Sequence, residues 1–400
     1  VRQHVYDSAR TIQNEGLYPE YLGFKLFQMD NYTDTLMLFE AASADELPPL
    51  QAMMTNTAYN VDNFETLADD LAWYIEKDWS TGAQRTDAPA LEPFSYARYW
   101  HGYLIWLRPL LLLMPYTGVR IVQYIVLFAL LAVVLVQLRR RCGLRAAVWF
   151  AVSQLAVSVW FVPHQMQYFT CFMIAYAGCA WVLAKPRRSD VLCLGLLVLG
   201  TATAFCDLLV TPIITLGLPL TCWLLEPQQR LRGGVPQCAL AVGGSLCWGT
   251  GYALCWAGKW ALAGAVTNNN VLADALHQAE VRTTADTWHG MELTWRNIFI
   301  FLYDTLNSHH LFWPALAVLA VLIALFILSI RSKTALVRAL PLALTTCMTP
   351  AWFVLLRTHS IQHGWFTWRA LGLTVFAGLA FLYYACDLRA ARRRLQKGSI

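Results

Sequence analysis

Residues 119–138 read VRIVQYIVLFALLAVVLVQL, and residues 139–145, which follow directly, read RRRCGLR. A helix needs about 20 mostly apolar residues to cross the hydrocarbon core of a bilayer, and this stretch has that length and composition. Basic residues just after such a helix are typical of its cytoplasmic end. The stretch therefore predicts a membrane-spanning helix whose C-terminal end lies in the cytoplasm.

The composition of the whole chain supports the same interpretation. Of its 400 residues, 57% are hydrophobic and 14% are charged, whereas soluble domains carry about 25% charged residues. We therefore predict an all-α integral membrane protein. The basic residues form no aromatic-rich polar module, which argues against nucleic-acid binding. The 11 cysteines form no CxxC pair, so we expect neither a disulfide framework nor a zinc site.

Apolar stretches of similar length recur along the chain, and together they predict about nine or ten membrane-spanning helices. Connections between them are short, apart from one long loop at 258–310. The predicted spans are 119–138, 146–162, 167–184, 190–206, 208–225, 236–257, 311–330, 338–356 and 367–387.

Lys and Arg residues occupy alternate connections. They gather at 139–145, 185–188, 226–233 and 331–338, and again in the tail 391–400. Cytoplasmic loops carry an excess of Lys and Arg, so we predict that these connections and the C-terminus lie in the cytoplasm. Residues 1–100 and the 258–310 loop then lie outside. We expect one further membrane-spanning helix to precede residue 1, because the N-terminal region must be exported.

The chain before the first predicted span divides into two parts. Residues 1–100 are of mixed polarity with apolar residues at helical spacing, which predicts an ordered, mostly helical outer loop. Residues 101–118 are apolar but contain Arg108, Pro109 and Pro115. This composition favours a helix that lies in the membrane interface or re-enters it.

The first candidate site is the segment DNYTD, residues 30–34. Asp30 and Asp34 are four residues apart, so a helix would place both carboxylates on one face. Such a pair can bind a divalent cation, or one member can accept a proton from an attacking hydroxyl. The alternative is structural: Asp30 caps the start of a helix and stabilises its dipole.

The second candidate is the loop RTHSIQHGWFTWR, residues 357–369. It carries Arg357, His359, His363 and Arg369 on the predicted outer side, against the usual charge bias. The two histidines have metal-pair spacing, but the loop offers no acidic ligand to complete a site. Because Arg binds phosphate oxygens bidentately, the loop predicts an anion-binding site.

Other ionisable residues at the predicted outer side have two interpretations each. Lys259 either reaches the outer headgroups or binds a lipid phosphate. Arg98, with Tyr99 and His101, either contacts headgroups or lines an outer cavity. Asp207 lies between two apolar runs, where it is either a functional intramembrane carboxylate or a turn residue.

Three short motifs, taken in order, resemble a known superfamily. They are DNYTD at 30–34, WAGKW at 256–260 and HSIQHGWFTWR at 359–369. Together with the large outer loop, they resemble bacterial polytopic membrane proteins similar to the GT-C glycosyltransferases. Members of that superfamily use polyprenyl-phosphate-linked sugars. The resemblance implies sugar transfer to a cell-envelope glycan, lipid or protein at the outer face of the bacterial cytoplasmic membrane.

The resemblance also implies roles for particular residues. Asp30 and Asp34 would provide the catalytic base or hold Mg²⁺ or Mn²⁺. His359, His363 and Arg369 would bind the lipid phosphate, with Lys259 assisting. In the superfamily the acidic pair usually follows the first span closely, whereas about thirty residues precede it in this chain.

Two other functions are compatible with a polytopic membrane protein. A transporter or flippase of lipid-linked saccharides or another solute would carry polar residues at mid-depth and often internal repeats. No repeat is visible, and Asp207 is the one candidate mid-depth charge. A non-catalytic scaffold would have no use for the outer polar clusters.

Overall fold

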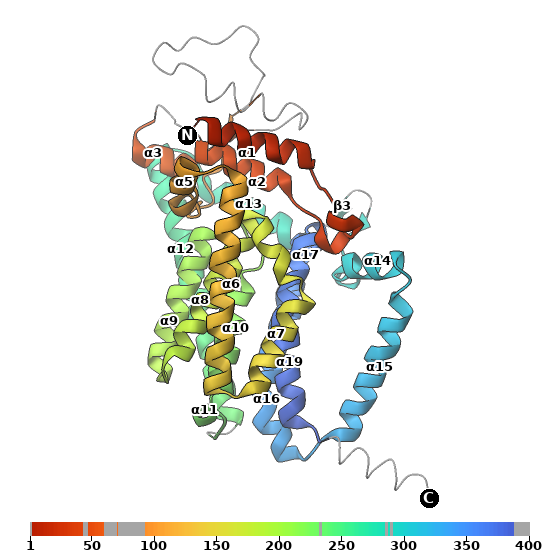
Figure 1. The fold of residues 1–400 in the computed structure, drawn as a ribbon. Helices are drawn as coiled ribbons and strands as arrows, with labels where there is room; N and C mark the ends of the chain where they lie inside the picture. The colour runs from red at the N-terminus through yellow and green to blue at the C-terminus, as the bar shows by residue number, and fades with distance from the viewer. Residues whose placement is uncertain are drawn as a thin grey trace, which may run out of the picture.

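The protein is a bundle of helices with further helices laid across one end (Figure 1). The structure is a computed structural model, and it describes residues 2–42, 47–59, 70, 93–231, 234–284, 287–288 and 291–387. The helices are α1 (Arg2–Glu15), α2 (Asn31–Ala42), α3 (Pro49–Thr55), α5 (Leu104–Leu113), α6 (Tyr116–Arg141), α7 (Leu144–Ala156), α8 (Met166–Ala184), α9 (Ser189–Cys206), α10 (Ile213–Leu225), α11 (Pro227–Leu231), α12 (Gly234–Thr267), α13 (Val271–Thr284), α14 (Ile300–Ser308), α15 (Phe312–Ser329), α16 (Lys333–Leu355), α17 (Arg357–Gln362), α18 (Gly364–Thr367) and α19 (Leu371–Ala385).

Short elements complete the fold. Two small antiparallel ladders pair β1 (Thr57–Tyr59) with β2 (Pro93–Ser95) and β3 (Thr287–Trp288) with β4 (Met291–Glu292). The 3₁₀ turns are η1 (Tyr21–Gly23), η2 (Lys25–Phe27), η4 (Val159–His164), η5 (Trp295–Asn297) and η6 (Trp368–Ala370).

The described helices confirm an all-α membrane protein. Six segments are long and apolar enough to cross a membrane, namely α6, α8, α9, α12, α16 and the run Gly364–Ala385. The helices α14 and α15 meet at 118° and would provide a seventh span if counted together. This number is below the nine or ten predicted from the sequence.

Two predicted spans differ because one helix ends early and the other begins late. The span at 146–162 becomes α7, which has 13 residues, and then breaks at Ser158, whose φ is +56°. The span at 208–225 becomes α10, also of 13 residues, because the chain is irregular before Pro212. A helix of that length covers only about 20 Å. The hydropathy of these two segments indicated that they are apolar, but it did not reveal where their helices are interrupted.

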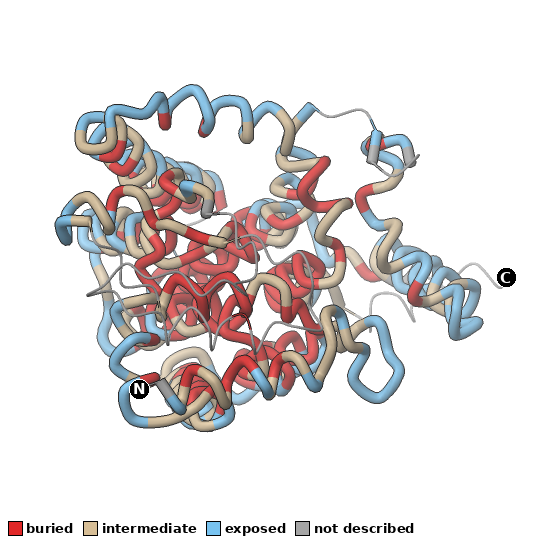
Figure 2. The backbone as a smooth tube through the Cα atoms, turned by 90° about the horizontal axis from the view of Figure 1, so that it is seen from above, coloured by how far each residue is buried: buried red, intermediate tan, exposed pale blue. Residues whose placement is uncertain are grey.

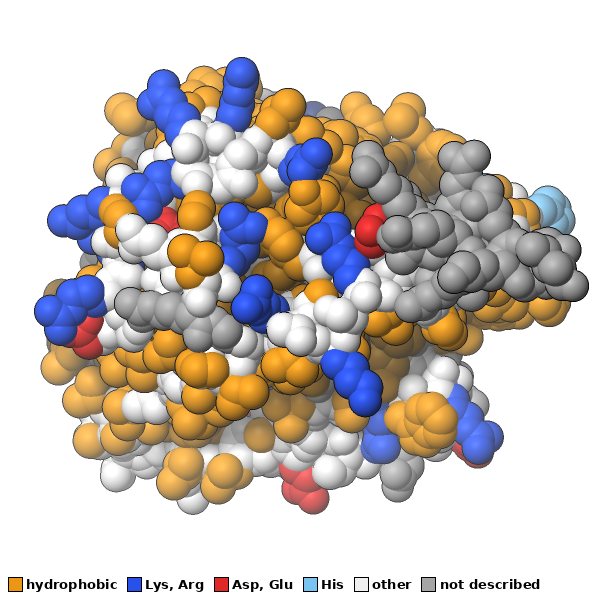
Figure 3. Space-filling view, turned by 90° about the horizontal axis from the view of Figure 1, so that it is seen from below, with side chains coloured by type: hydrophobic (Ala, Val, Ile, Leu, Met, Phe, Trp, Pro, Cys, Tyr) orange, Lys and Arg blue, Asp and Glu red, His pale blue; other side chains and the backbone are white. Residues whose placement is uncertain are grey.

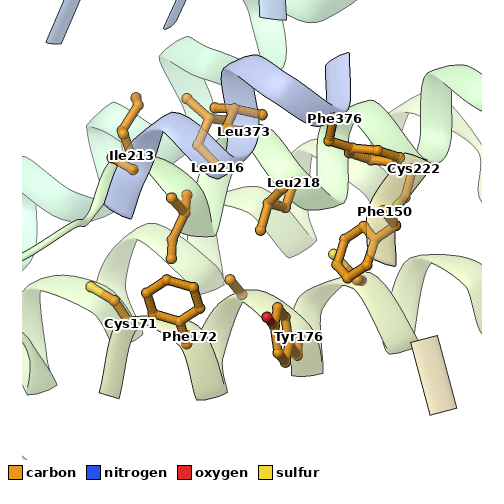
Figure 4. Packing of buried hydrophobic residues seen from close by; sticks show 14 of the residues in the cluster. Phe150, Cys171, Phe172, Tyr176, Ile213, Leu216, Leu218, Cys222, Leu373 and Phe376 are labelled. Carbon is orange, nitrogen blue, oxygen red and sulfur yellow. The ribbon is translucent and has the colours of Figure 1, made fainter. Parts of the chain in front are cut away.

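The core lies where α7, α8, α10 and α19 meet, at the centre of the view along the bundle (Figure 2). Phe150 of α7 packs edge-on against Phe376 of α19 at 5.0 Å between ring centroids, and Tyr176 of α8 lies 5.8 Å from Phe150. Leu218 of α10 lies beside these rings in the same cluster (Figure 4). All residues of α10 are buried, so this short helix is enclosed by protein rather than lipid.

Four helices, α1, α2, α3 and α5, cover one end of the bundle, which we call the cap end (Figure 1). Ile12, Phe39 and Leu107 are buried where α1, α2 and α5 meet. In α5, Ile105, Leu112 and Leu113 are exposed, as expected for a helix that contacts lipid. That 101–118 lies in the membrane interface stays a prediction.

The basic connections lie at the opposite end, which we call the basic end. The α6–α7, α8–α9, α10–α12 and α15–α16 connections all reach it, and Lys and Arg side chains spread over its face (Figures 1 and 3). The connections predicted to be basic therefore lie together at one end of the molecule, opposite to the cap end. The tail 391–400 lies outside the described residues.

Candidate functional site

Asp30 acts as the cap of α2. Its Oδ1 accepts the backbone N–H of Thr33 at 3.0 Å, and its Oδ2 accepts the Thr33 hydroxyl at 3.1 Å. A carboxylate that satisfies the third N–H of a helix is a typical N-cap. Burial raises the pKa of this carboxyl, while the Thr33 N–H opposes the rise. The structural interpretation of Asp30 therefore accounts for its contacts.

Asp34 fastens α2 to the first turn of α8. Its carboxylate accepts the backbone N–H groups of Met166 at 3.1 Å and Gln167 at 3.2 Å, together with the Tyr116 hydroxyl. Burial raises the pKa of Asp34 to about 7, and the hydrogen bond from Tyr116 opposes the rise. The oxygens of both aspartates thus accept hydrogen bonds from the protein, and a Mg²⁺ or Mn²⁺ site at this pair stays a prediction.

Arg369 lies near the same part of α8. Its Nη2 donates to the carbonyl of Leu26 at 2.9 Å, and its guanidinium lies 4.7 Å from the Tyr168 ring centre. Tyr168 in turn donates to the carbonyl of Gln28 at 3.2 Å. The structure thus brings Arg369 close to the segment that leads into Asp30. Among the described residues, no hydrogen bond or ion pair joins Arg369 to Asp30 or Asp34.

His359 and His363 lie side by side, with ring centroids 4.7 Å apart. The Nε2 atom of His359 is 2.9 Å from the carbonyl of Leu209. Burial lowers the pKa of His359 well below its usual range and that of His363 to about 4. Both rings are therefore neutral near pH 7, and they can meet a phosphate only through hydrogen bonds.

The remaining predicted cations occupy separate places. Lys259 is buried, and its Nζ donates to the carbonyls of Met53 at 2.8 Å and Met54 at 3.2 Å. Arg98 pairs with Asp274 at 3.2 Å. Arg357 begins α17 and is half-buried.

Asp207 proves to be a turn residue at the end of α9. Its carboxylate accepts the N–H of Val210 at 3.0 Å, and this bond shapes the irregular segment before α10.

A cavity of about 520 Å³ opens at the cap end and contains a carboxylate that the sequence patterns did not single out. Glu40 of α2 lines it and is only 3% exposed, and its Oε1 has no hydrogen-bond partner among the described residues. The cavity lies between α2, α3 and α5. Its walls include Asn56, Thr57, Trp100, His101, Arg108 and Phe205.

The second oxygen of Glu40 belongs to a buried cluster. His101 Nδ1 lies 2.5 Å from Oε2, and the Tyr103 hydroxyl donates to the same oxygen. His101 Nε2 is 3.2 Å from the carbonyl of Tyr96, so both ring nitrogens lie beside oxygen atoms. His101 also has a φ of +53°. Such strained backbone persists where the surroundings hold it, often at functional sites.

Arg108 brings a cation to the same cavity. Its Nη2 donates to the Glu40 backbone carbonyl at 3.0 Å, while much of the side chain remains exposed. Arg108 lies on α5, beside the exposed Ile105. The cavity is therefore lined by a glutamate with one oxygen unpaired among the described residues and by an arginine next to an apolar surface.

No protein-family model, curated protein or solved structure matches this chain. The role of the candidate site is therefore inferred from the geometry of its residues.

Sequence reasoning named His101 and Arg108 but missed Glu40. The available signal was the acidic residue that directly follows Leu36-Met37-Leu38-Phe39 in a helical pattern. Among the described residues, no group of three or more His, Cys, Asp or Glu side chains is arranged to hold a metal ion.

Proposed function

We propose that this protein is a membrane glycosyltransferase that uses a polyprenyl-phosphate-linked sugar at the outer face of the membrane. The proposal rests on the cap-end cavity, which is lined by both Glu40, whose Oε1 has no partner among the described residues, and Arg108 of α5. A lipid-linked donor needs its phosphate at the membrane surface and its sugar in an aqueous pocket. The position of Arg108 next to an apolar helix surface supports that arrangement.

The reaction assigns one role to each side chain. The acceptor hydroxyl attacks the anomeric carbon of the donor sugar, and the bond from that carbon to the phosphate oxygen breaks. Glu40 Oε1 takes the hydroxyl proton as general base. The polyprenyl phosphate leaves with the bonding electrons, and Arg108 stabilises its charge through bidentate hydrogen bonds.

The environment of Glu40 suits a base. His101 and Tyr103 hold Oε2 in place, while Oε1 of the same cavity-lining residue has no hydrogen-bond partner among the described residues. Trp100 lines the same cavity, and an aromatic face can pack against a sugar ring. In this proposal Asp30 and Asp34 position α2, which carries Glu40, and do not react themselves.

The test is sugar transfer by the purified full chain in membranes. The donors are prenyl-phosphate-linked hexoses and pentoses, and the readout is release of prenyl phosphate in the presence of a cell-envelope extract. Removing a general base typically costs about 10²–10⁴-fold in rate. We expect such a loss in Glu40→Gln, and a raised KM for the donor in Arg108→Gln.

Two variants serve as controls. Glu280→Gln removes an exposed carboxylate of α13 and should leave transfer unchanged. Asp30→Asn keeps a good capping group and should retain most of the activity. Full activity in Glu40→Gln, together with loss of transfer in a folded Asp30→Asn variant, would assign the base to Asp30 instead of Glu40.

Transport of a lipid-linked saccharide is the alternative function. Asp207, the candidate mid-depth charge for transport, is occupied in a local turn. A flippase would move a fluorescent prenyl-phosphate sugar between leaflets without breaking it. Translocation without release of prenyl phosphate would therefore contradict the transferase proposal.

A further inference from the structure

A second cavity, of about 360 Å³, opens at the basic end, far from the cap-end cavity. Its walls come from α10, α11, α12, α16 and α19. Lys and Arg side chains surround a hollow near the middle of this face (Figure 3). The polar residues that line the cavity include Gln229, Arg230, Gln237, Arg331, Arg338 and Tyr384.

Three guanidinium groups line this cavity, and each has a distinct setting. Arg331 is held by donation to the carbonyls of Cys386 and Tyr383, the latter at 3.3 Å. Arg230 lies 4.7 Å over the Tyr384 ring. Arg338 makes no hydrogen bond or ion pair with any part of the chain that the structure describes. Two of the three cations are thus oriented by neutral partners, and none is neutralised by a described carboxylate.

No carboxylate is among the described residues that line the cavity. The buried Glu226 is nearby in the chain, but its Oε1 accepts from Arg141 at 2.8 Å. The described side chains that line the cavity therefore carry a net positive charge, and an anion would enter without displacing an ion pair among them.

Two uncharged features of the cavity wall add to the cations: the exposed cap of α16 and the buried amide of Gln237. Ser332 caps α16 by accepting the Ala335 N–H at 3.1 Å, and both residues line the cavity, so the positive end of the helix dipole faces it. Gln237 is 3% exposed, and its Nε2 donates to the Gln229 carbonyl at 2.9 Å. Its Oε1 has no partner among the described residues. A ligand that offers both anionic oxygens and a hydroxyl donor would satisfy these groups together.

We propose that this cavity binds the phosphate of an anionic phospholipid with a hydroxylated headgroup, of the phosphatidylglycerol type. Guanidinium forks suit the two free oxygens of a phosphodiester, and Gln237 Oε1 can accept a headgroup hydroxyl. The surface around Arg230 and Arg338 is apolar and exposed. Leu231 is 87% exposed, and Val337 and Leu340 are 45% and 41% exposed. Acyl chains can lie on this surface while the phosphate occupies the cavity, which favours a lipid over a soluble phosphate.

The test measures lipid binding to the intact chain in detergent by native mass spectrometry. Phosphatidylglycerol and phosphatidylcholine are titrated separately. We expect phosphatidylglycerol to bind more tightly, and Arg230→Gln/Arg331→Gln/Arg338→Gln to weaken it by about tenfold or more, because hydrogen bonds to charged groups are among the strongest. Arg338→Lys keeps the charge but not the fork, so it should give a smaller loss.

A matched triple variant separates a site from general charge. Arg139→Gln/Arg140→Gln/Lys185→Gln removes three exposed cations of the same end outside the cavity, and we expect binding within about twofold of the unaltered chain. Equal losses in both triple variants, or no loss in either, would overturn the proposal. If the first triple variant does not fold, the single substitution Arg338→Gln, at an exposed residue, tests the proposal instead. The proposal then requires this variant to bind phosphatidylglycerol more weakly than the unaltered chain.

A third arm separates lipid from soluble phosphate. Glycerol phosphate carries the phosphate and the hydroxylated headgroup but no acyl chains. Inorganic phosphate carries the phosphate alone. Retention of phosphatidylglycerol in a large excess of either supports a lipid site. Displacement at equal concentration would show that the acyl chains contribute nothing, and the lipid assignment would fail.

Discussion

At the scale of single residues, two carboxylates of α2 have opposite environments. Asp34 accepts hydrogen bonds from Tyr116 and from two backbone N–H groups of α8. Glu40, less than two helical turns later, keeps one oxygen unpaired among the described residues and beside a cavity. A carboxylate whose oxygens accept hydrogen bonds holds structure together, while a carboxylate oxygen without a partner can accept a proton. This contrast underlies the choice of Glu40 as the base.

The buried carboxyl of Asp34 predicts a stability that depends on pH. Its pKa is raised to about 7 in the fold, against about 3.9 in an unfolded chain. The folded state therefore binds the proton more tightly, and its stability falls as pH rises from about 4 to about 7. The size of the effect is on the order of a few kcal/mol.

Thermal unfolding of the detergent-solubilised chain between pH 5 and pH 8 checks this prediction. The fall in unfolding midpoint should be smaller in Asp34→Asn, which cannot ionise, while the exposed Asp304→Asn variant should follow the unaltered protein. Identical profiles for all three proteins would show that Asp34 does not titrate in this range.

At the scale of elements, the contact between α9 and α12 depends on glycine. A Cβ at Gly251 would lie 2.1 Å from the carbonyl oxygen of Leu197, and one at Gly200 would lie 2.1 Å from that of Trp248. Small residues let membrane helices approach closely enough for van der Waals packing. The breaks that shorten α7 and α10 belong to the same scale. Irregular backbone follows α7 and precedes α10.

This contact predicts that two glycines of one helix respond differently to substitution. Gly251→Ala forces α9 and α12 apart and should destabilise the protein by about 1–3 kcal/mol, as overpacking does. Gly249→Ala places a Cβ in open space and should be neutral. Unfolding midpoints of the two variants give the comparison, and equal values would rule out tight packing at Gly251.

At the scale of the whole molecule, charge separates the two ends of the bundle. The basic connections gather at the end opposite to the cap formed by α1, α2, α3 and α5 (Figures 1 and 3). The positive-inside tendency then predicts that the basic end faces the cytoplasm. The transferase proposal requires this orientation because its cavity lies at the cap end.

Labelling of intact spheroplasts tests the orientation. Thr284→Cys adds a thiol at the exposed end of α13, and Ser332→Cys adds one at the basic end. A membrane-impermeant maleimide should label the Thr284→Cys variant above the unaltered chain in intact cells. It should label the Ser332→Cys variant only after lysis. The reverse pattern would place the Glu40 cavity inside the cell and exclude the proposed reaction there.

The sequence alone determined the all-α membrane class, the positions of most apolar helices and the grouping of basic connections. These properties are local, because the transfer free energy that favours a span is summed over about 20 consecutive residues. The sequence also indicated that Asp30 could cap a helix, and the contacts of Asp30 with Thr33 support this interpretation. The breaks before α10 and after α7, the pairing of Glu40 with His101 and the cavity of Arg230, Arg331 and Arg338 were decided only by the tertiary structure. Each depends on which side chains distant in sequence become neighbours, and no local pattern carries that information.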